Sequence, residues 1–304
     1  MLTGRVVRIV GNLYHVENAD GEWDITLTGK IRRARDGASK PAAVGDEVEF
    51  EPGSPGEGKL LRTLPRRTKL CRAGGSGGRI ESVLVANADR VLAVFSSHNP
   101  DPDFRAVDRA LVMGEAGKME CAIAINKVDL APPPPEMEAY RAAGYPVFAT
   151  SAAKGQGLAD LRAWLHGKVT ALMGPSGVGK SSLLNALEPS WELTTGELSL
   201  RIQEGRHTTT WVEMHRLSSG GYVVDTPGIE NFGLWGIVAE DLPAYFPETR
   251  ALQGKCRFRN CGHESEPGCA LKAEVEAGRL TKRRYEGYLS ILRELRESAP
   301  AERW

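Results

Sequence analysis

The chain has 304 residues, which favours two or three compact domains over one. Hydrophobic residues make up 41% and charged residues 26% of it, a composition that excludes a disordered chain. No apolar stretch approaches the ~20 residues of a membrane helix, and the N-terminus lacks a signal-peptide core, so we expect neither a membrane protein nor a secreted one. Lysine plus arginine and aspartate plus glutamate both number 39, so any binding to nucleic acid must come from local basic patches.

Residues 1–68 predict a small β domain. Gly11-Asn12 is a two-residue hairpin signal, and so many short strands in one small segment predict a closed barrel, either OB-like or SH3-like. The stretches 30–35 and 62–72 are basic, which favours an anionic partner over a solvated surface. The expected strands are Arg5–Val10, Leu13–Glu17, Glu22–Leu27, Glu47–Glu51 and Lys59–Leu64.

Residues 69–235 predict a second domain, in which apolar strands alternate with amphipathic helices. This alternation is typical of a mostly parallel α/β sheet covered by helices. The expected strands are Arg90–Phe95, Cys121–Ile125, Pro146–Ala149, Lys168–Met173 and Tyr222–Val224, and the expected helices are Phe104–Ala116, Leu158–Leu165 and Ser181–Leu187.

Residues 236–304 predict a helical domain with a metal site. Three thiolates and one imidazole within a short segment satisfy a closed tetrahedral zinc site, which we expect to be structural, with one ion per chain. Cysteines used in this way indicate a reducing compartment, so we expect a cytoplasmic protein. The expected ligands are Cys256, Cys261, His263 and Cys269. Helices are expected over Ala270–Ala277 and Lys282–Glu297, the second with a packing face of Tyr285, Tyr288, Leu289, Leu292 and Leu295.

The segment 174–182 matches the phosphate-binding loop G-x-x-x-x-G-K-S/T, with a hydrophobic strand before it and an amphipathic helix after it. Its backbone N–H groups would surround a phosphate, Lys180 would contact the terminal phosphates, and the Ser181 hydroxyl would bind Mg²⁺. The residues of the loop are Gly174, Pro175, Ser176, Gly177, Val178, Gly179, Lys180, Ser181 and Ser182.

A second phosphate signal is Asp225-Thr226-Pro227-Gly228, which comes directly after the strand expected at Tyr222–Val224. An acidic residue at the end of a strand suits a Mg²⁺ carboxylate, so we assign Asp225 to the metal. The backbone N–H of Gly228 would reach the γ-phosphate. Alone, this tetrapeptide is more often a simple turn.

Two further short motifs stand at the ends of strands and suit a guanine base. In Asn126-Lys127-Val128-Asp129 the carboxylate of Asp129 would accept two hydrogen bonds from guanine, which adenine cannot donate, so an ATP-driven enzyme is disfavoured. Asn126 would tie loops together, and Lys127 would cover the purine. Backbone N–H groups near Ser151 and Ala152 would bind the guanine oxygen. In α/β sheets, ligands bind at the carboxyl ends of the strands, where all these motifs lie.

These motifs resemble those of GTPases, but their order is rotated, because the guanine motifs at 126 and 150 precede the phosphate loop at 174. Such a circular permutation keeps every strand in place. With a β-barrel in front and a Cys/His cluster behind, the whole chain resembles the ribosome small-subunit-dependent GTPases of the RsgA family. The resemblance implies a multidomain α/β protein: an N-terminal OB-like barrel (1–68), a permuted GTPase domain (69–235) and a C-terminal zinc-binding helical domain (236–304).

The resemblance also implies GTP hydrolysis stimulated by the small ribosomal subunit, late maturation of that subunit, and contact with its rRNA. The segment 205–210 resembles the family's switch I, where a threonine would bind Mg²⁺; the spacing leaves Thr208, Thr209 and Thr210 open, and we favour Thr208. Ile229 stands where Ras-like enzymes place a water-orienting glutamine, so we assign that role to His207, with a backbone carbonyl or rRNA as the alternatives.

The exposed surfaces for RNA are less sharply defined by the sequence. On the barrel, Tyr14 and Trp23 could stack on bases, although Trp23 suits a core equally well. Basic residues at Lys30, Arg32, Arg33 and Arg35, and again at Lys282, Arg283 and Arg284, could contact phosphates. We expect a monomer. The alternative function is a GTP-switched rRNA-binding module with little or no catalysis of its own, which Ile229 favours.

Overall fold

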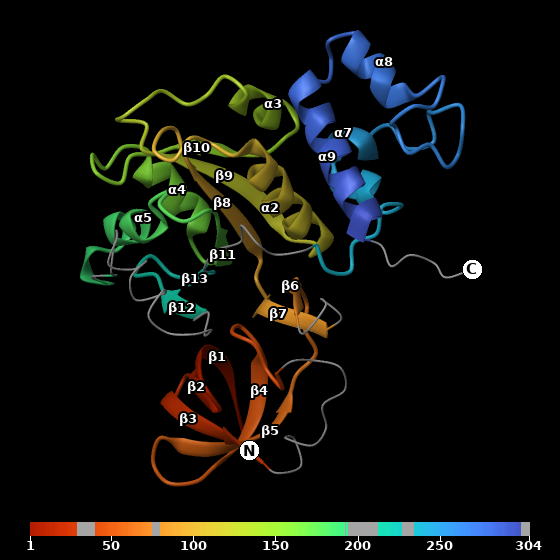
Figure 1. The fold of residues 1–304 in the computed structure, drawn as a ribbon. Coiled ribbons are helices and arrows are strands. Elements are labelled where there is room, and N and C mark those ends of the chain that lie inside the picture. The colour runs from red at the N-terminus through yellow and green to blue at the C-terminus, as the bar shows by residue number, and fades with distance from the viewer. Residues whose placement is uncertain (29–39, 75–79, 192, 194–211, 227–233, 299–304) are drawn as a thin grey trace.

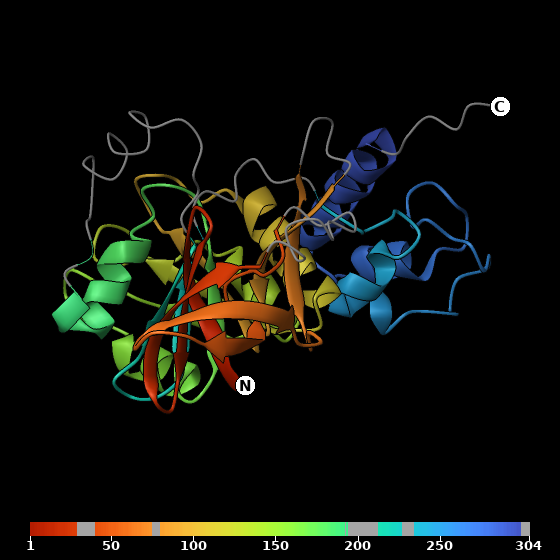
Figure 2. The same cartoon turned by 90° about the horizontal axis from the view of Figure 1, so that it is seen from below.

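The computed structural model describes residues 1–28, 40–74, 80–191, 193, 212–226 and 234–298. Figure 1 shows a β-barrel, a central sheet with helices and a C-terminal helical region, and Figure 2 shows the same arrangement from below. This is the predicted three-part architecture. Among the helices of the described ranges, none is both long and apolar enough to cross a membrane.

The N-terminal strands form a closed barrel of the predicted OB-like kind. Their order is β1-β2-β3-β5-β4, and β4 returns to pair with β1. Its interior is apolar, with Val6, Ile25, Phe50 and Leu60 fully buried. The strands are β1 (Leu2–Val10), β2 (Leu13–Asn18), β3 (Gly21–Leu27), β4 (Glu47–Pro52) and β5 (Glu57–Thr63).

The central sheet has the order β10-β9-β8-β11-β13-β12, and only β12 within it runs antiparallel to its neighbour. A single pairing, Arg8 with Glu213, joins β12 to β1, so the sheet continues into the barrel. The strands are β8 (Arg90–Ser96), β9 (Glu120–Asn126), β10 (Val147–Ala149), β11 (Val169–Met173), β12 (Glu213–Arg216) and β13 (Tyr222–Asp225).

Alternate residues of each central strand face opposite helical layers. On β8, Leu92 and Val94 pack with α4 and α5, whereas Val91 and Phe95 pack with α2 and α3. Both faces are therefore covered, which explains why the sequence of these strands is continuously apolar. The helices are α2 (Phe104–Ala116), α3 (Met137–Ala142), α4 (Leu158–Leu165) and α5 (Lys180–Leu187), with the short 3-10 turn η1 (Pro189–Trp191) after them.

A separate hairpin, β6 (Lys69–Gly74) with β7 (Ile80–Ala86), lies between the barrel and the central sheet, as Figure 1 shows. The sequence patterns did not predict it. Isolated bridges join Val44 to Val85 and Arg72 to Leu234, so the hairpin touches the barrel domain on one side and the start of the C-terminal region on the other.

The C-terminal region packs its helices around a third apolar cluster, to which α2 contributes Val112. On the predicted packing face of the last helix, Tyr288, Leu292 and Leu295 are buried, and Tyr285 and Leu289 pack against the same cluster. The elements are η3 (Leu242–Tyr245), α7 (Pro247–Arg250), α8 (Ala270–Glu276) and α9 (Lys282–Ser298).

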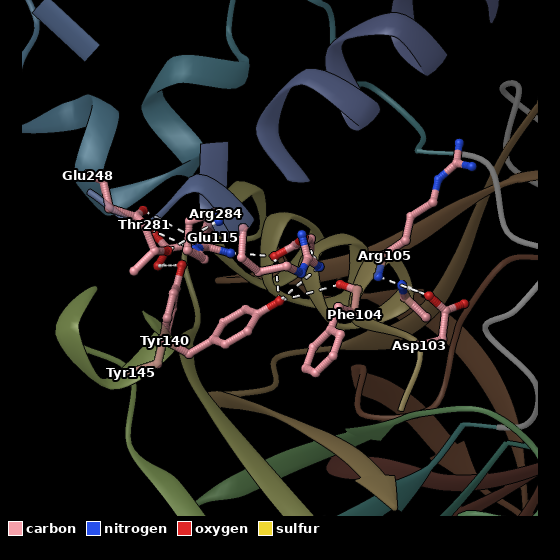
Figure 3. Close-up of polar contacts among 12 residues, drawn as sticks. Asp103, Phe104, Arg105, Glu115, Tyr140, Tyr145, Glu248, Thr281 and Arg284 are labelled. Atoms are coloured by element: carbon pink, nitrogen blue, oxygen red, sulfur yellow. Dashed lines mark hydrogen bonds and ion pairs between the residues drawn. The ribbon is translucent and has the colours of Figure 1, made fainter. Parts of the chain in front are cut away.

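A buried ion-pair network fixes α9 to the central domain, and Figure 3 shows part of it around Arg284 and Tyr140. The Asp108 carboxylate of α2 is fully buried and accepts from Arg284, from Arg283 at 2.9 Å and from the Tyr140 hydroxyl at 3.0 Å. Arg284 also donates to Glu248 at 2.6 Å. At Gly287 the two helices approach so closely that any Cβ would collide with the Asp108 carboxylate.

Candidate nucleotide-binding site and metal cluster

The phosphate-loop segment connects β11 to α5 in a turn that its glycines permit. Gly179 has φ +92°, and a Cβ there would lie 2.5 Å from the Asn126 amide nitrogen. A Cβ at Gly174 would collide with the Val94 carbonyl oxygen. Because α5 begins at Lys180, Ser181 and Ser182 lie in its first turn, where free backbone N–H groups favour an anion.

Lys180 folds back over its own loop. Its ammonium group donates to the carbonyl oxygens of Gly174 and Pro175, each at 2.8 Å. In the same loop Ser176 and Gly177 are exposed, while Val178 is buried among apolar residues of the α4–α5 layer. The loop therefore has a cation at its centre and exposed backbone at its rim, an arrangement that suits a phosphate group.

Asn126 connects the guanine motifs to the phosphate loop. Its amide nitrogen donates to the carbonyl oxygen of Val178 at 3.1 Å and to that of Gly179 at 3.4 Å. Its amide oxygen accepts from the backbone N–H of Ala152 at 3.1 Å. One buried side chain at the end of β9 thus holds three loops together.

Lys127 lies across the same loops. Its backbone adopts φ +63°, and its ammonium group donates to the carbonyl oxygen of Gly177 at 2.7 Å and to that of Asn99. Burial lowers the pKa of this lysine, and Asp129 opposes that shift. The Ser97 hydroxyl donates to the Lys127 carbonyl oxygen at 2.7 Å. Ser97 and Asn99 were missed at the sequence level, because no motif marks them; their position directly after β8 was the only available signal.

Asp129 is exposed, and Ser151 fixes its orientation. The Ser151 hydroxyl donates to Asp129 Oδ1 at 2.5 Å, and the Ser151 oxygen in turn accepts from the backbone N–H of Lys154 at 3.1 Å. The carboxylate is therefore aimed before any ligand arrives. It keeps free acceptor positions, the property needed to receive two donors from a base.

Asp225 ends β13 next to β11, in register with Leu172. Its Oδ1 atom is buried and has no hydrogen-bond partner among the described residues. Burial raises the pKa of this carboxyl group, while Lys180 and His215 oppose the shift. A buried carboxylate oxygen without a donor is costly unless a cation or a donor binds to it. Asp225 is therefore suited to hold a cation.

Several predicted site residues lie outside the described residues. These are the switch residues His207 and Thr208 with their neighbours Thr209 and Thr210, the γ-phosphate contact Gly228, the substituted position Ile229, and the barrel cations Lys30, Arg32, Arg33 and Arg35.

The predicted metal ligands come together. One ligand atom from each of Cys256, Cys261, His263 and Cys269 lies within 4.8 Å of the other three. The His263 Nδ1 atom is 3.6 Å from Cys256 Sγ and 3.4 Å from Cys269 Sγ. This closed set of three thiols and one imidazole is a possible zinc site.

The surroundings of the cluster hold its loops in place. Glu266 accepts backbone N–H bonds from Gly262 at 2.6 Å and from Glu264 at 3.0 Å. From α9, the Tyr285 hydroxyl donates to the His263 carbonyl oxygen at 2.8 Å. The ligand loop is thus fastened both to itself and to the last helix.

Two of the RNA surfaces suggested by the sequence are not available as predicted. Tyr14 is 2% exposed and belongs to the barrel core, so its ring cannot stack on a base. Arg284 is also 2% exposed, and with Arg283 it is engaged by the Asp108 network. Trp23 is half-buried against Phe50, with ring centroids 5.3 Å apart. Of the cationic triplet on α9, only Lys282 remains exposed.

Comparison with known proteins identifies the family. The model of the RsgA GTPase family matches residues 63–235. The small ribosomal subunit biogenesis GTPase RsgA of Moorella thermoacetica is 42% identical over 298 residues, 97% of each chain, and that of Gemmatimonas aurantiaca is 42% identical over 299 residues, 96% of this chain and 97% of the relative. The crystal structure of YjeQ from Thermotoga maritima superposes with a TM-score of 0.76 at 35% identity, covering 96% of this chain and 98% of that one. The structure of YloQ, a circularly permuted GTPase, gives 0.72 at 31% identity, with 100% and 97% covered. The chain therefore belongs to the RsgA family of circularly permuted GTPases.

Proposed function

We propose that this protein is a Mg²⁺-dependent GTPase of the cytoplasm that acts as a monomer, is stimulated by the small ribosomal subunit, and serves the late maturation of that subunit in contact with its rRNA. The observation that supports this best is the double attachment of Asn126. Its hydrogen bonds to the Val178 carbonyl oxygen and from the Ala152 N–H, both at 3.1 Å, join the guanine motifs to the phosphate loop. The names of the relatives, which are biogenesis factors of the small subunit, support the ribosomal partner.

In this proposal the guanine base is bound at the end of β9. Asp129, oriented by Ser151, accepts from the base, and Lys127 covers it. We assign the contact with the guanine oxygen to the backbone of Ser151 and Ala152 on their sequence; in the structure the Ala152 N–H donates to Asn126 Oδ1 at 3.1 Å. A purine without the two matching donors would leave the carboxylate unpaired, which disfavours adenine.

The phosphates are bound at the start of α5. Lys180 exchanges its two carbonyl contacts for phosphate oxygens, and the first turn of the helix supplies N–H donors. Ser181 and Asp225 are the oxygen ligands of Mg²⁺, an ion that prefers such hard donors, and the buried Oδ1 of Asp225 fits that role. When bound, Mg²⁺ neutralises charge on the phosphates. We assign water positioning to His207 and the switch contact to Thr208 on their sequence alone.

The Cys/His cluster holds one structural zinc ion in this proposal. Three cysteines and one histidine fill a tetrahedral shell, so no position is left for a reacting water. The zinc would stabilise the ligand loop that α9 already contacts through Tyr285.

Phosphate release from GTP, measured with and without purified small subunits, tests the proposal. We expect strong stimulation by subunits in the wild type and its loss in Lys180→Ala, whereas Lys168→Ala, an exposed lysine at the opposite end of β11, serves as the control. The competing function is a GTP-switched rRNA-binding module with little catalysis, which the sequence favours through Ile229. Absence of stimulation, together with GTP-dependent subunit binding, would establish that alternative.

A further inference from the structure

A cavity of about 800 Å³ lies where the three parts of the molecule meet. The barrel domain contributes Thr63 and Leu64, and the chain leading into β6 contributes the stretch 66–69. The end of α2 forms another wall, and the fourth is the segment Trp235–Ile237, which begins the C-terminal region. Figure 1 shows how β6 comes between the barrel and the central domain at this place. The cavity is separate from the phosphate loop, since no residue of 174–182 lines it.

The lining of this cavity is predominantly cationic. Its charged residues are five cations, Lys40, Arg66, Arg67, Lys69 and Lys118, and one acid, Glu81. Three of the cations are paired: Arg66 with Asp46 at 2.7 Å, Lys69 with Glu81 at 2.6 Å, and Arg67 with Asp89 at 3.3 Å.

The other two cations differ from these three. Lys40 and Lys118 are exposed and form no ion pair with a described residue, so their ammonium groups remain available to an anion.

An aromatic surface lies beside these cations. Trp235 is half-buried, yet it belongs to none of the four hydrophobic clusters that the described residues form. Tyr245, from η3, lines the same cavity. Tyr245 also packs against the C-terminal apolar cluster, so both rings are only partly accessible. Aromatic rings with an accessible face beside cations are the means by which proteins hold unstacked bases next to their phosphates.

The lining and the volume of the cavity favour a phosphodiester over a free nucleoside polyphosphate. The wall at Ala116 and Gly117 is the C-terminal end of α2, where the helix dipole is negative and repels concentrated negative charge. The two unpaired lysines come from different parts of the chain, one before β4 and one after α2, which suits singly charged phosphates along a strand. A volume of about 800 Å³ lies within the range of small-ligand pockets and accommodates one nucleotide.

We propose that this junction cavity receives one unstacked nucleotide of a single-stranded RNA segment, with Lys40 and Lys118 on its flanking phosphates and Trp235 against its base. This inference rests on the proposed function, which supplies the RNA partner. It adds an RNA contact outside the surface of the barrel. A nucleotide bound here touches the barrel, the GTPase domain and the C-terminal region together, so it would fix their relative orientation.

Photo-crosslinking of the full chain with a single-stranded oligonucleotide that contains 4-thiouridine tests the placement. We expect the crosslinked peptides to contain Trp235 or Tyr245. Free UMP, added at the same nucleotide concentration, should not compete. Competition by UMP would make this a mononucleotide site and overturn the proposal, as would crosslinks confined to the barrel strands.

Salt-dependent binding of the same oligonucleotide tests the charges. Replacing Lys40 and Lys118 together by alanine should reduce the slope of log K against log salt by about 1.4, since each phosphate contact with a single strand contributes about 0.7. The matched control removes two exposed lysines elsewhere, Lys168 and Lys255, and should keep the wild-type slope. Equal slopes in the two double variants would overturn the proposal.

The aromatic contact has its own variant pair. Trp235→Ala should weaken binding about 5- to 150-fold, the range of one base stack, whereas Trp235→Phe should retain most of the affinity. Equal losses in both variants would contradict stacking. Subunit-stimulated GTP hydrolysis, assayed in parallel on the wild type, distinguishes failure of the proposed function from failure of this inference. Absence of stimulation would refute the proposed function. Stimulation together with unchanged oligonucleotide binding in all variants would refute only this inference.

Discussion

The carboxylate of Asp129 is oriented by a single hydroxyl. The short bond from Ser151, 2.5 Å to Oδ1, holds an otherwise exposed side chain in one direction. Such preorganisation reduces the conformational cost that ligand binding must overcome. In the proposed guanine site, base selectivity would reside in the donor and acceptor pattern of this one side chain.

We predict that Asp129→Asn reverses this pattern. The amide presents a donor where the carboxylate presented acceptors, so GTP affinity should fall by about 100-fold or more. Xanthosine triphosphate, which offers an acceptor at that edge, should then bind better than GTP. Competition between the two nucleotides measures the change, and Asp160→Asn on the exposed face of α4 is the control. Unchanged GTP preference would contradict the assignment of Asp129 to the base.

Individual residues differ in how far sequence alone defines them. The places of Asn126 and Lys180 at the ends of β9 and of the phosphate loop could be predicted, because the spacing of each motif is itself the signal; their roles toward a nucleotide stay predictions. The burial of Tyr14 and Arg284 could not be, because a ring or a guanidinium is buried only when distant elements close over it. For Arg284 those elements are α2 and α7, whose acids Asp108 and Glu248 lie far from it in the chain.

At the scale of elements, the contact between α2 and α9 depends on buried charge as well as on apolar packing. Asp108 is fully buried with two guanidinium groups and the Tyr140 hydroxyl around it. Gly287 permits that approach, because a side chain there would occupy the position of the carboxylate. The pairs from Arg105 and Arg109 to Glu294, at 3.5 and 2.5 Å, extend the contact along both helices.

We predict that Asp108→Ala destabilises the protein by about 3–5 kcal/mol, since it leaves the buried Arg284 without this partner. Arg105→Ala removes a largely exposed pair at the edge of the same contact and should cost less than about 1 kcal/mol. Urea unfolding, monitored by circular dichroism, gives both values. Equal effects of the two substitutions would show that the buried network contributes no more than a surface pair.

Elements with a strong period could be predicted closely, and irregular ones could not. The α2 and α4 helices have the bounds that their apolar spacing indicates. The β6–β7 hairpin has a mixed sequence, and it is held by tertiary contacts such as the bridges at Val85 and Arg72. The short strand β12, Glu213–Arg216, is likewise defined by its neighbours β13 and β1.

For the whole molecule, the rotated order of the motifs along the chain leaves the arrangement of the strands in the central sheet unchanged. The carboxyl ends of β9, β10, β11 and β13 lie at one edge, whichever of them comes first in the chain. The rotation does change the connection after β13, because the chain there continues through Trp235 into the C-terminal region. The segment Trp235–Ile237 thereby becomes a wall of the junction cavity, and a short stretch of chain would join the proposed nucleotide site to the proposed RNA site.

The last helix has an attachment to the central domain that does not involve the Cys/His cluster, which leads to our last prediction. The ligand loop depends on the cluster, since the Ala270 N–H that opens α8 donates to Cys256 Sγ at 3.3 Å, whereas α9 is held by Asp108. Removing the proposed zinc ion with a chelator should therefore abolish hydrogen-exchange protection over residues 256–276 but preserve it in α9. GTP affinity should remain within about twofold of the untreated protein, because none of the four ligands lies in the central domain. Cys261→Ser should reproduce the effect and Cys71→Ser, which alters a cysteine outside the cluster, should not. Unaltered protection over 256–276 after complete metal removal would show that the loop is stable on its own. Loss of protection in α9 would show that the buried network alone does not hold the helix in place.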